Sequence, residues 1–127
     1  MVDAEQIYSM LDQGYASVRY FSEEVFEASQ VLKNVKNILE RRKAEFVENP
    51  EFVALKTADQ QRYIQMKLNE EIYDVERRQE DYDKKLQGLR IAQLQVEEAR
   101  AYLRLFIATQ ENISSFEDDV QAEQREH

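Results

Sequence analysis

Residue types that carry catalysis are scarce in this chain. His127 is the single histidine, and there is no cysteine. A zinc site needs imidazole or thiolate ligands, and an activated nucleophile needs a base beside it. The paired acids Glu70-Glu71 and Glu97-Glu98 are of the kind found in carboxylate-bridged metal bundles, but those bundles also use a Glu-x-x-His motif, which is absent here. Two isolated glycines cannot form a phosphate-binding loop. We therefore expect no enzyme activity, no cofactor and no metal.

Basic side chains form clusters in the middle of the chain and could contact nucleic-acid phosphates, with Tyr63, Tyr73 and Tyr82 stacking on unpaired bases. The competing interpretation is that these charges alternate with Glu and Asp in i,i+4 pairs on solvated helices. The second interpretation is favoured, because the formal net charge is −9 and nucleic-acid-binding domains are usually basic. The candidate phosphate contacts are Arg41, Arg42, Lys43, Arg77, Arg78, Lys84 and Lys85.

Aromatic residues gather near the N-terminus. Tyrosine is enriched at protein interfaces, where one end of the side chain can be apolar and the other wet. Core packing accounts for Phe21 and Phe26, but the three tyrosines of this segment cannot all lie on one buried helix face. Ordinary packing and an interface, including one with a second copy, both stay open. The candidate partner interface is Tyr8, Tyr15, Tyr20 and Phe26.

Charge is unevenly distributed along the sequence. Residues 1–30 carry six acids against Arg19, and residues 111–127 carry six acids against Arg125, which leaves the middle nearly neutral. If the two ends meet, they form an acidic pole that could imitate the phosphates of DNA toward a nucleic-acid-binding protein. The favoured alternative is that acidic ends only keep a helical protein soluble.

The elements that position these side chains are predicted to be two long helices. With two glycines and one proline the chain has few turns, and its helix formers are typical of long-helix proteins. Apolar residues alternate three and four apart from Val18 to Phe46, which indicates a helix over about 4–48, with Asp3 as a possible cap. Asn49-Pro50 ends that helix. The fold class is therefore all-α.

A second helix is predicted over about 58–112, after a tip at 49–57 in which Phe52 and Leu55 form about one helical turn. Thr57-Ala58-Asp59-Gln60 matches a capping box. Gln79, Gln93 and Arg100 interrupt the apolar seam of this helix, where polar residues can set register. The predicted oligomer seam is Leu68, Ile72, Val75, Leu86, Leu89, Val96 and Leu103.

Two long helices joined by a short tip predict a long, coiled-coil-like antiparallel hairpin over 1–113. A turn near residue 53 would put Arg41 roughly beside residue 65. A two-helix core is thin, so we expect a dimer or a larger assembly, such as a four-helix bundle. The positions expected to be exposed in a single chain and covered in such a bundle are Phe26, Val31, Ile38, Ala92, Ala99 and Phe106. Residues 114–127 are predicted to form an acidic flexible tail.

The layout resembles short all-helical accessory proteins encoded by bacteriophages, including the recombination mediators of T4-type phages. The resemblance rests on chain length and on the segments 34–39 (NVKNIL) and 96–104 (VEEARAYLR). It implies a helical oligomer that helps to load a recombinase on single-stranded DNA. It identifies no functional residue.

These observations predict a non-enzymatic, oligomeric helical adaptor or assembly protein whose partners are itself and another protein. The alternative is a phage-type accessory factor in nucleic-acid metabolism, either a single-strand-binding mediator or an acidic DNA mimic. No apolar run approaches the roughly 18 residues of a membrane span, and the acidic start Met1–Glu5 does not resemble a signal peptide. We therefore expect a cytoplasmic protein without a membrane partner.

Overall fold

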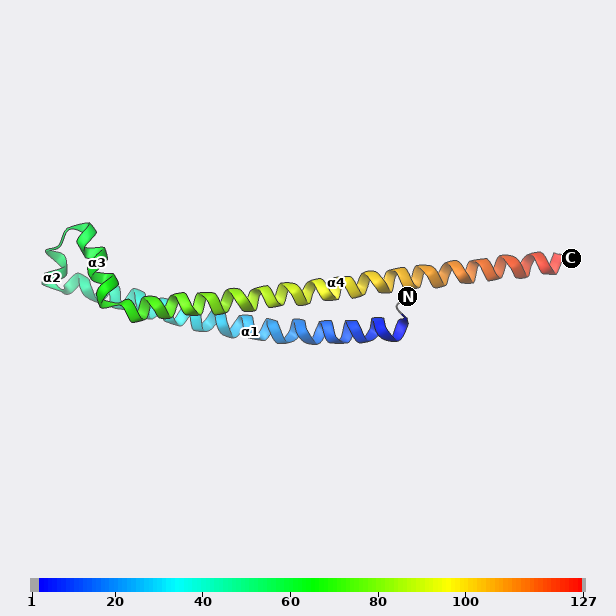
Figure 1. Ribbon diagram of the computed structural model, residues 1–127, viewed down its shortest axis with the longest axis horizontal. Coiled ribbons are helices and arrows are strands. Elements are labelled where there is room, and N and C mark those ends of the chain that lie inside the picture. Colours follow the sequence, from blue (N-terminus) through cyan, green and yellow to red (C-terminus); the bar gives the residue numbers. More distant parts are fainter. Residues whose placement is uncertain (1–2, 127) are drawn as a thin grey trace. The chain divides into compact units, whose positions relative to one another are not determined.

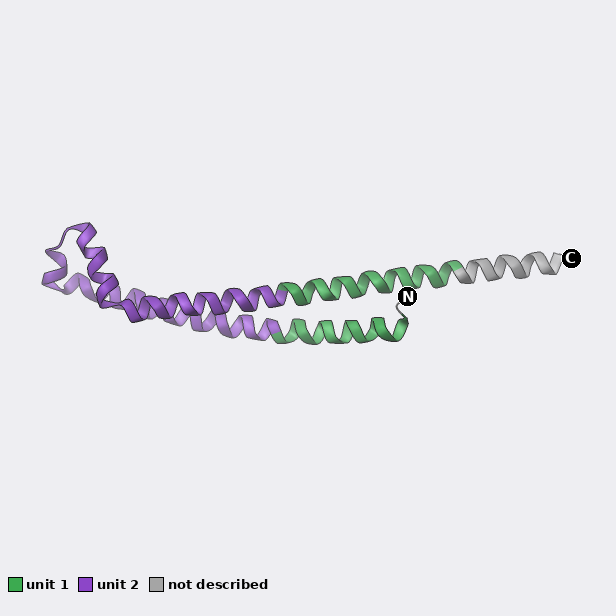
Figure 2. Ribbon diagram, viewed as in Figure 1, with its two compact units in different colours: residues 1–20, 90–127 green, residues 21–89 purple. Residues whose placement is uncertain are grey.

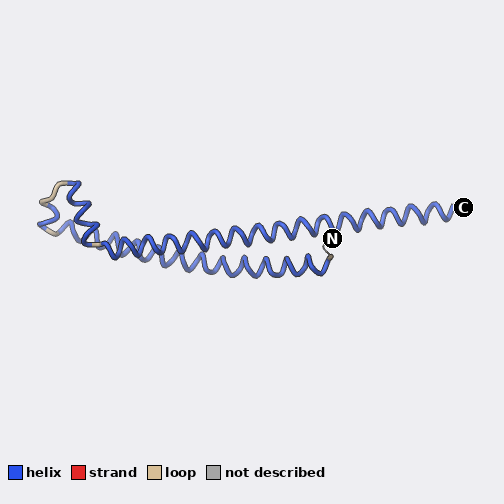
Figure 3. Tube along the Cα trace, viewed as in Figure 1, coloured by secondary structure: helices blue, strands red, loops and turns tan. Residues whose placement is uncertain are grey.

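The computed structural model describes the backbone of residues 3–126 and the side chains of residues 3–112. Its elements are α1 (Ala4–Glu45), a 3₁₀ turn (Phe46–Glu48), α2 (Pro50–Val53), α3 (Thr57–Lys67) and α4 (Asn69–Glu126), as Figure 1 shows. No strand occurs within residues 3–126 (Figure 3). The two long helices α1 and α4 run antiparallel and pack against each other, which confirms the predicted all-α hairpin.

The start of α1 is fixed by a reciprocal pair of hydrogen bonds. The Gln6 backbone N–H donates to Asp3 Oδ1 at 2.8 Å, and the Asp3 N–H donates to Gln6 Oε1 at 3.0 Å. This capping box satisfies two donors that a helix start leaves without intrahelical partners. The expectation that Asp3 caps the first helix is confirmed.

The tip forms where Asn49-Pro50 was expected to end the first helix. The Asn49 side chain accepts a hydrogen bond from the Glu51 N–H at 2.9 Å, and Pro50 opens α2 at a position where its missing N–H leaves no helical bond unmade. The single turn of α2 confirms the expected short helix at the tip. Phe46, Phe52 and Tyr63 pack together there, with ring centroids 5.5 to 5.8 Å apart.

Two predictions about the second helix were wrong in detail. Helix α3 starts at Thr57, but its N-cap is Lys56 and no side chain caps it; Gln60 instead donates to the Phe52 carbonyl at 3.1 Å. The helix expected to be continuous over 58–112 is interrupted at Leu68 (φ −112°, ψ 25°), a buried residue between α3 and α4. A hydrogen bond from Gln60 and the ring contact of Tyr63 with Phe46 hold α3 against the tip. Because the chain bends at Leu68, α3 and α4 run in different directions (Figure 1).

The chain divides into two compact units, each containing part of both long helices (Figure 2). In the unit of residues 1–20 and 90–127, Gly14 faces Val96 so closely that a Cβ on Gly14 would lie 2.7 Å from Val96 Cγ2. In the unit of residues 21–89, the Phe21 ring covers Gly88, and a Cβ there would lie 2.7 Å from Phe21 Cδ1. Each glycine therefore permits a close approach of α1 and α4 that a larger residue would obstruct.

The buried line of α4 differs from the predicted one in its second half. Ala92 and Ala99, expected to be exposed in a single chain, are 1% and 0% exposed. Gln93 and Arg100, expected to interrupt the seam, are exposed instead. The predicted line through Gln93, Val96 and Arg100 and the buried line through Ala92, Val96 and Ala99 both follow a spacing of three and four residues. Because α1 approaches α4 closely at Gly14, the small alanines are favoured as the residues of α4 that face α1.

The remaining packing predictions have mixed outcomes. Phe26, Val31 and Ile38 are exposed, as expected for one chain, whereas Phe106 is half-buried. Arg42 lies 3.8 Å from Glu71, so the helices are offset by several residues from the expected pairing of Arg41 with residue 65. The residues predicted to form the seam are all at least half-buried: Leu68, Ile72, Val75, Leu86, Leu89, Val96 and Leu103.

The predicted tail falls outside the residues whose side chains are described, so its acidic, flexible character stays a prediction. The part of the predicted acidic pole in residues 113–127 lies outside those residues as well, so the meeting of the two acidic ends stays a prediction. In the described part of the chain, no helix combines the length and apolar character needed to cross a membrane.

Candidate interaction surfaces

The predicted partner interface begins with Tyr8 and Tyr15, which are 58% and 43% exposed. They are seven residues apart, so at 3.6 residues per turn they lie almost in line along α1. From α4, Arg100 donates two hydrogen bonds to the Tyr15 hydroxyl, from Nη2 at 2.8 Å and from Nε at 3.1 Å. Its guanidinium carbon also lies 5.6 Å from the centroid of the Tyr15 ring. Arg100 therefore holds Tyr15 in place on the surface.

Tyr20 and Phe26 are exposed as well, but they do not extend the same patch. Tyr20 follows Tyr8 by twelve residues, which turns it about 120° around α1. Phe26 belongs to the other compact unit. The three tyrosines do not share one buried face, as expected: Tyr8 and Tyr15 lie on one side of α1, and Tyr20 lies apart from them. Phe26 is 64% exposed, so core packing within one chain does not account for it.

A second apolar line on α4 was missed from the sequence. Its large exposed side chains include Leu94 and Leu105, at 63% and 65%, together with Ile91 and Tyr102. Ile91 and Leu94, like Tyr102 and Leu105, are three residues apart, and the eight residues from Leu94 to Tyr102 keep all four on one side of a helix. The signal is weak because Glu98 separates the two pairs and because all four residues lie between positions of the predicted seam.

Most of the predicted phosphate contacts lie beside carboxylates. Arg42 is 3.8 Å from Glu71, and Lys85 is 2.6 Å from Glu24. The other ion pairs are Arg42–Glu45, Lys43–Glu40, Arg77–Asp74, Arg78–Asp74 and Lys85–Asp81. This arrangement supports the interpretation that the basic residues form pairs on solvated helices, and it lowers the charge available for phosphate binding.

Arg78 differs from its neighbours. Its Nε is buried without a hydrogen-bond partner, and the 3.7 Å to the Asp74 carboxylate is too long for a hydrogen bond. The ion pair therefore compensates only part of the hydration that this nitrogen loses.

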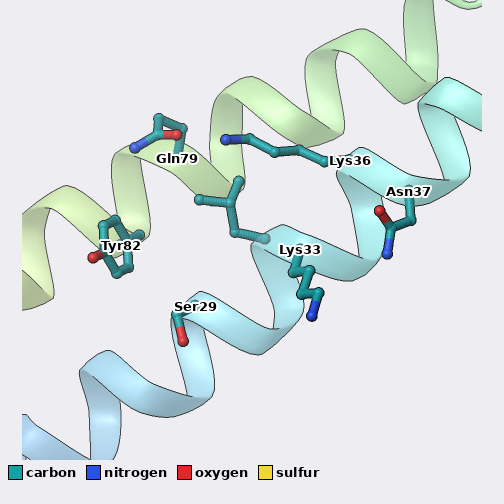
Figure 4. A pocket seen from close by; sticks show the side chains of 7 residues that line it. Ser29, Lys33, Lys36, Asn37, Gln79 and Tyr82 are labelled. Atoms are coloured by element: carbon teal, nitrogen blue, oxygen red, sulfur yellow. The ribbon is translucent and has the colours of Figure 1, made fainter.

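A notch between α1 and α4 is lined by two lysines that were not among the predicted phosphate contacts. Its volume is about 450 Å³. Figure 4 shows that α1 contributes Lys33 and Lys36, and α4 contributes Tyr82, one of the tyrosines proposed to stack on bases. Ser29, Leu32, Asn37 and Gln79 complete the lining. In Figure 4 the Lys36 side chain extends toward α4, whereas the Lys33 side chain points away from it, so Lys36 supplies the ammonium group of the notch that could bind an anion.

The other two tyrosines proposed to stack on bases are placed differently. Tyr63 is packed against Phe46 and Phe52 at the tip, and Lys67 lies over its ring with the ammonium 5.7 Å from the centroid. Tyr73 is exposed. Tyr63 is therefore a packing residue of the tip, whereas Tyr73 is accessible to a ligand.

Acidic residues do not gather into a metal site in the described part of the chain, where no three His, Cys, Asp or Glu side chains come together suitably. Glu71, from one of the paired acids, instead lies beside Arg42. Comparison with known proteins finds no matching family model, curated protein or solved structure.

Proposed function

We propose that the protein is a non-enzymatic helical adaptor or assembly protein that self-associates and binds a further protein. The observation that carries this proposal is the exposure of large apolar and aromatic side chains on both long helices. The chain exposes 10210 Å², whereas a folded monomer of 15.1 kDa exposes about 7100 Å² by the usual scaling of surface with mass.

The core of a single chain is small. Among the described residues, the buried apolar positions are Ile7, Ala28, Leu32, Leu39, Leu68, Ala92, Val96 and Ala99. Each long helix of a hairpin has one neighbour along most of its length and leaves its flanks to solvent. In a four-helix bundle each helix has two neighbours, which cover those flanks. Self-association would therefore supply the burial that one chain lacks.

The patch of Tyr8, Tyr15 and Arg100 is the proposed contact with a different protein. Tyrosine and arginine are the residue types that most often dominate binding energy at interfaces. Because Arg100 already holds the Tyr15 hydroxyl at 2.8 Å, less side-chain entropy is lost when a partner covers this patch. The proposed site of action is the cytoplasm, in keeping with a sequence that lacks cysteine.

A second candidate function is binding of single-stranded nucleic acid, as in a phage-type accessory factor. The notch lined by Lys36 and Tyr82 favours it, because an ammonium group and an aromatic ring in one notch suit a backbone phosphate and its base. The net charge of −9 and the ion pairs of the other basic residues oppose it.

Size-exclusion chromatography with light scattering distinguishes these functions. The sample is run alone and with a single-stranded oligonucleotide, at low and moderate salt. The adaptor proposal predicts a defined oligomer that does not co-elute with the strand. Co-elution that is lost as salt rises, and that Lys36→Ala weakens, would replace it with the nucleic-acid function, because phosphate contacts release counterions. A monomer in every run would contradict self-association.

A further inference from the structure

The exposed apolar line on α4 lies in the unit formed by residues 1–20 and 90–127. At about 100° per residue, Ile91, Leu94, Tyr102 and Leu105 are centred roughly 130° around the helix from the buried line of Ala92, Val96 and Ala99. Glu98 lies at the middle of this line. It is the one charged residue on this side of α4, because the other residues there between Leu94 and Tyr102 are Gln95 and Ala101.

The side of α1 that lies next to this line of α4 carries no charged side chain. The contact between Tyr15 and Arg100 marks one flank of the hairpin in this unit. On the opposite flank, next to the apolar line of α4, helical spacing places the α1 residues Gln6, Ser9, Gln13, Ala16, Ser17 and Tyr20. The centres of protein interfaces are depleted of charged residues in the same way. This face therefore has the composition of a surface that is covered by protein.

We propose that this face binds a second copy of the chain, with the two α4 helices antiparallel and the two-fold axis at Glu98. The inference rests on the proposed self-association and names the surface responsible. A two-fold interface must be self-complementary, so that if residue i contacts j, residue j contacts i. The line meets this condition, because its steps from Ile91 through Leu94, Glu98 and Tyr102 to Leu105 are three, four, four and three residues. Ile91 then faces Leu105 of the second copy, and Leu94 faces its Tyr102.

The area and charge of this unit suit such a contact. A stable interface covers about 800 Å² on each partner, and the four large apolar side chains of this face are 37 to 65% exposed and so offer surface to cover. Residues 90–112 carry three basic and three acidic side chains, so two copies meet with little net repulsion. Repulsion is expected only at the axis, where Glu98 of one copy faces Glu98 of the other. Glu98→Gln should therefore tighten the dimer about tenfold, because facing like charges oppose association.

Cysteine cross-linking tests the register, since the chain has no cysteine of its own. Under mild oxidation, Glu98→Cys should form a disulfide-linked dimer. Ile91→Cys alone should not, because two copies of residue 91 would be about 21 Å apart along the axis, too far for a disulfide. An equimolar mixture of Ile91→Cys and Leu105→Cys should cross-link. Gln93→Cys, exposed on the other flank, is the matched control and should stay unlinked.

The outcomes separate this surface from the proposed function. Cross-linking of Ile91→Cys with itself would mean parallel helices and overturn the proposal. A dimer by light scattering that neither Glu98→Cys nor the mixed pair links would overturn this surface while leaving self-association intact. A wild-type monomer at all concentrations would overturn both. Circular dichroism of each variant shows whether its helices are retained, and the tighter association of Glu98→Gln gives a readout that needs no disulfide.

Discussion

The contact between Gly14 and Val96 gives the sharpest test of how α1 and α4 pack. In an isolated helix, Gly14→Ala should stabilise the helix by about 1 kcal/mol, because alanine is the better helix former. Here the new methyl would lie 2.7 Å from Val96 Cγ2, with the Val96 Cα and N at 3.6 Å. A valine in a helix has one strongly preferred rotamer, so it cannot easily turn away.

Overpacking of this kind costs about 1 to 3 kcal/mol, which exceeds or cancels the gain in helix propensity. We therefore expect Gly14→Ala alone to leave stability unchanged or to lower it by up to about 2 kcal/mol. Val96→Ala alone should destabilise by about 2 kcal/mol, since Val96 is buried. In the Val96→Ala background the obstruction is gone, so Gly14→Ala should become stabilising by about 1 kcal/mol.

Urea unfolding followed by circular dichroism measures each free energy, at one fixed protein concentration because the chain is proposed to self-associate. The coupling energy of the double-mutant cycle should reach at least about 1 kcal/mol. Gly88→Ala is the matched control, because its methyl meets Phe21 and should not couple to Val96→Ala. If Gly14→Ala is fully stabilising in the wild-type background, the pairing of α1 with α4 described above is wrong.

Chemical unfolding of three further variants tests other contacts of the hairpin. Leu89→Asp places a charge on a half-buried seam position and should lower the free energy of unfolding by on the order of 2 kcal/mol. Gln87→Asp, on the exposed side of α4, should leave it unchanged, and equal effects of the two variants would refute the assigned register. Asn49→Ala removes the cap of α2 and should lower stability by about 1 kcal/mol, and an unchanged midpoint would show that the cap is unimportant. Lys85→Met removes the partner of Glu24 and should lower stability by up to about 1 kcal/mol, more than Lys84→Met does; the reverse order would argue against that pair.

The parts of the fold that local chemistry determines were predictable from the sequence. Asp3 caps α1 through its own neighbour Gln6, and Asn49-Pro50 ends the first helix because proline restricts the residue before it. The interruption at Leu68 was not predictable in this way. It depends on the packing of Tyr63 with Phe46 and Phe52, residues brought together only by the turn of the chain.

The error at Ala92 and Ala99 has a different cause. Hydrophobic patterning gives weight to large apolar residues, whereas two helices in close contact select small ones. The sequence offered both possibilities around Val96, and the glycine opposite, Gly14, was the signal in favour of the alanines.

The candidate surfaces were predictable only in part. Helical spacing showed that Tyr8, Tyr15 and Tyr20 could not all lie on one buried face, whereas the exposure of Phe26 did not follow from it. The hold of Arg100 on Tyr15 links residues 85 positions apart and requires the register of the hairpin. Prediction of the notch required the same register, because Lys36 of α1 and Tyr82 of α4 line one notch only when the two helices pair.

Self-association can be measured by sedimentation equilibrium of the unmodified chain over a wide concentration range. We expect a mass of at least twice 15.1 kDa that falls toward the single-chain value on dilution. A mass of 15.1 kDa at every concentration would contradict it, because the exposed apolar residues of α1 and α4 would then be stable in water without a second copy.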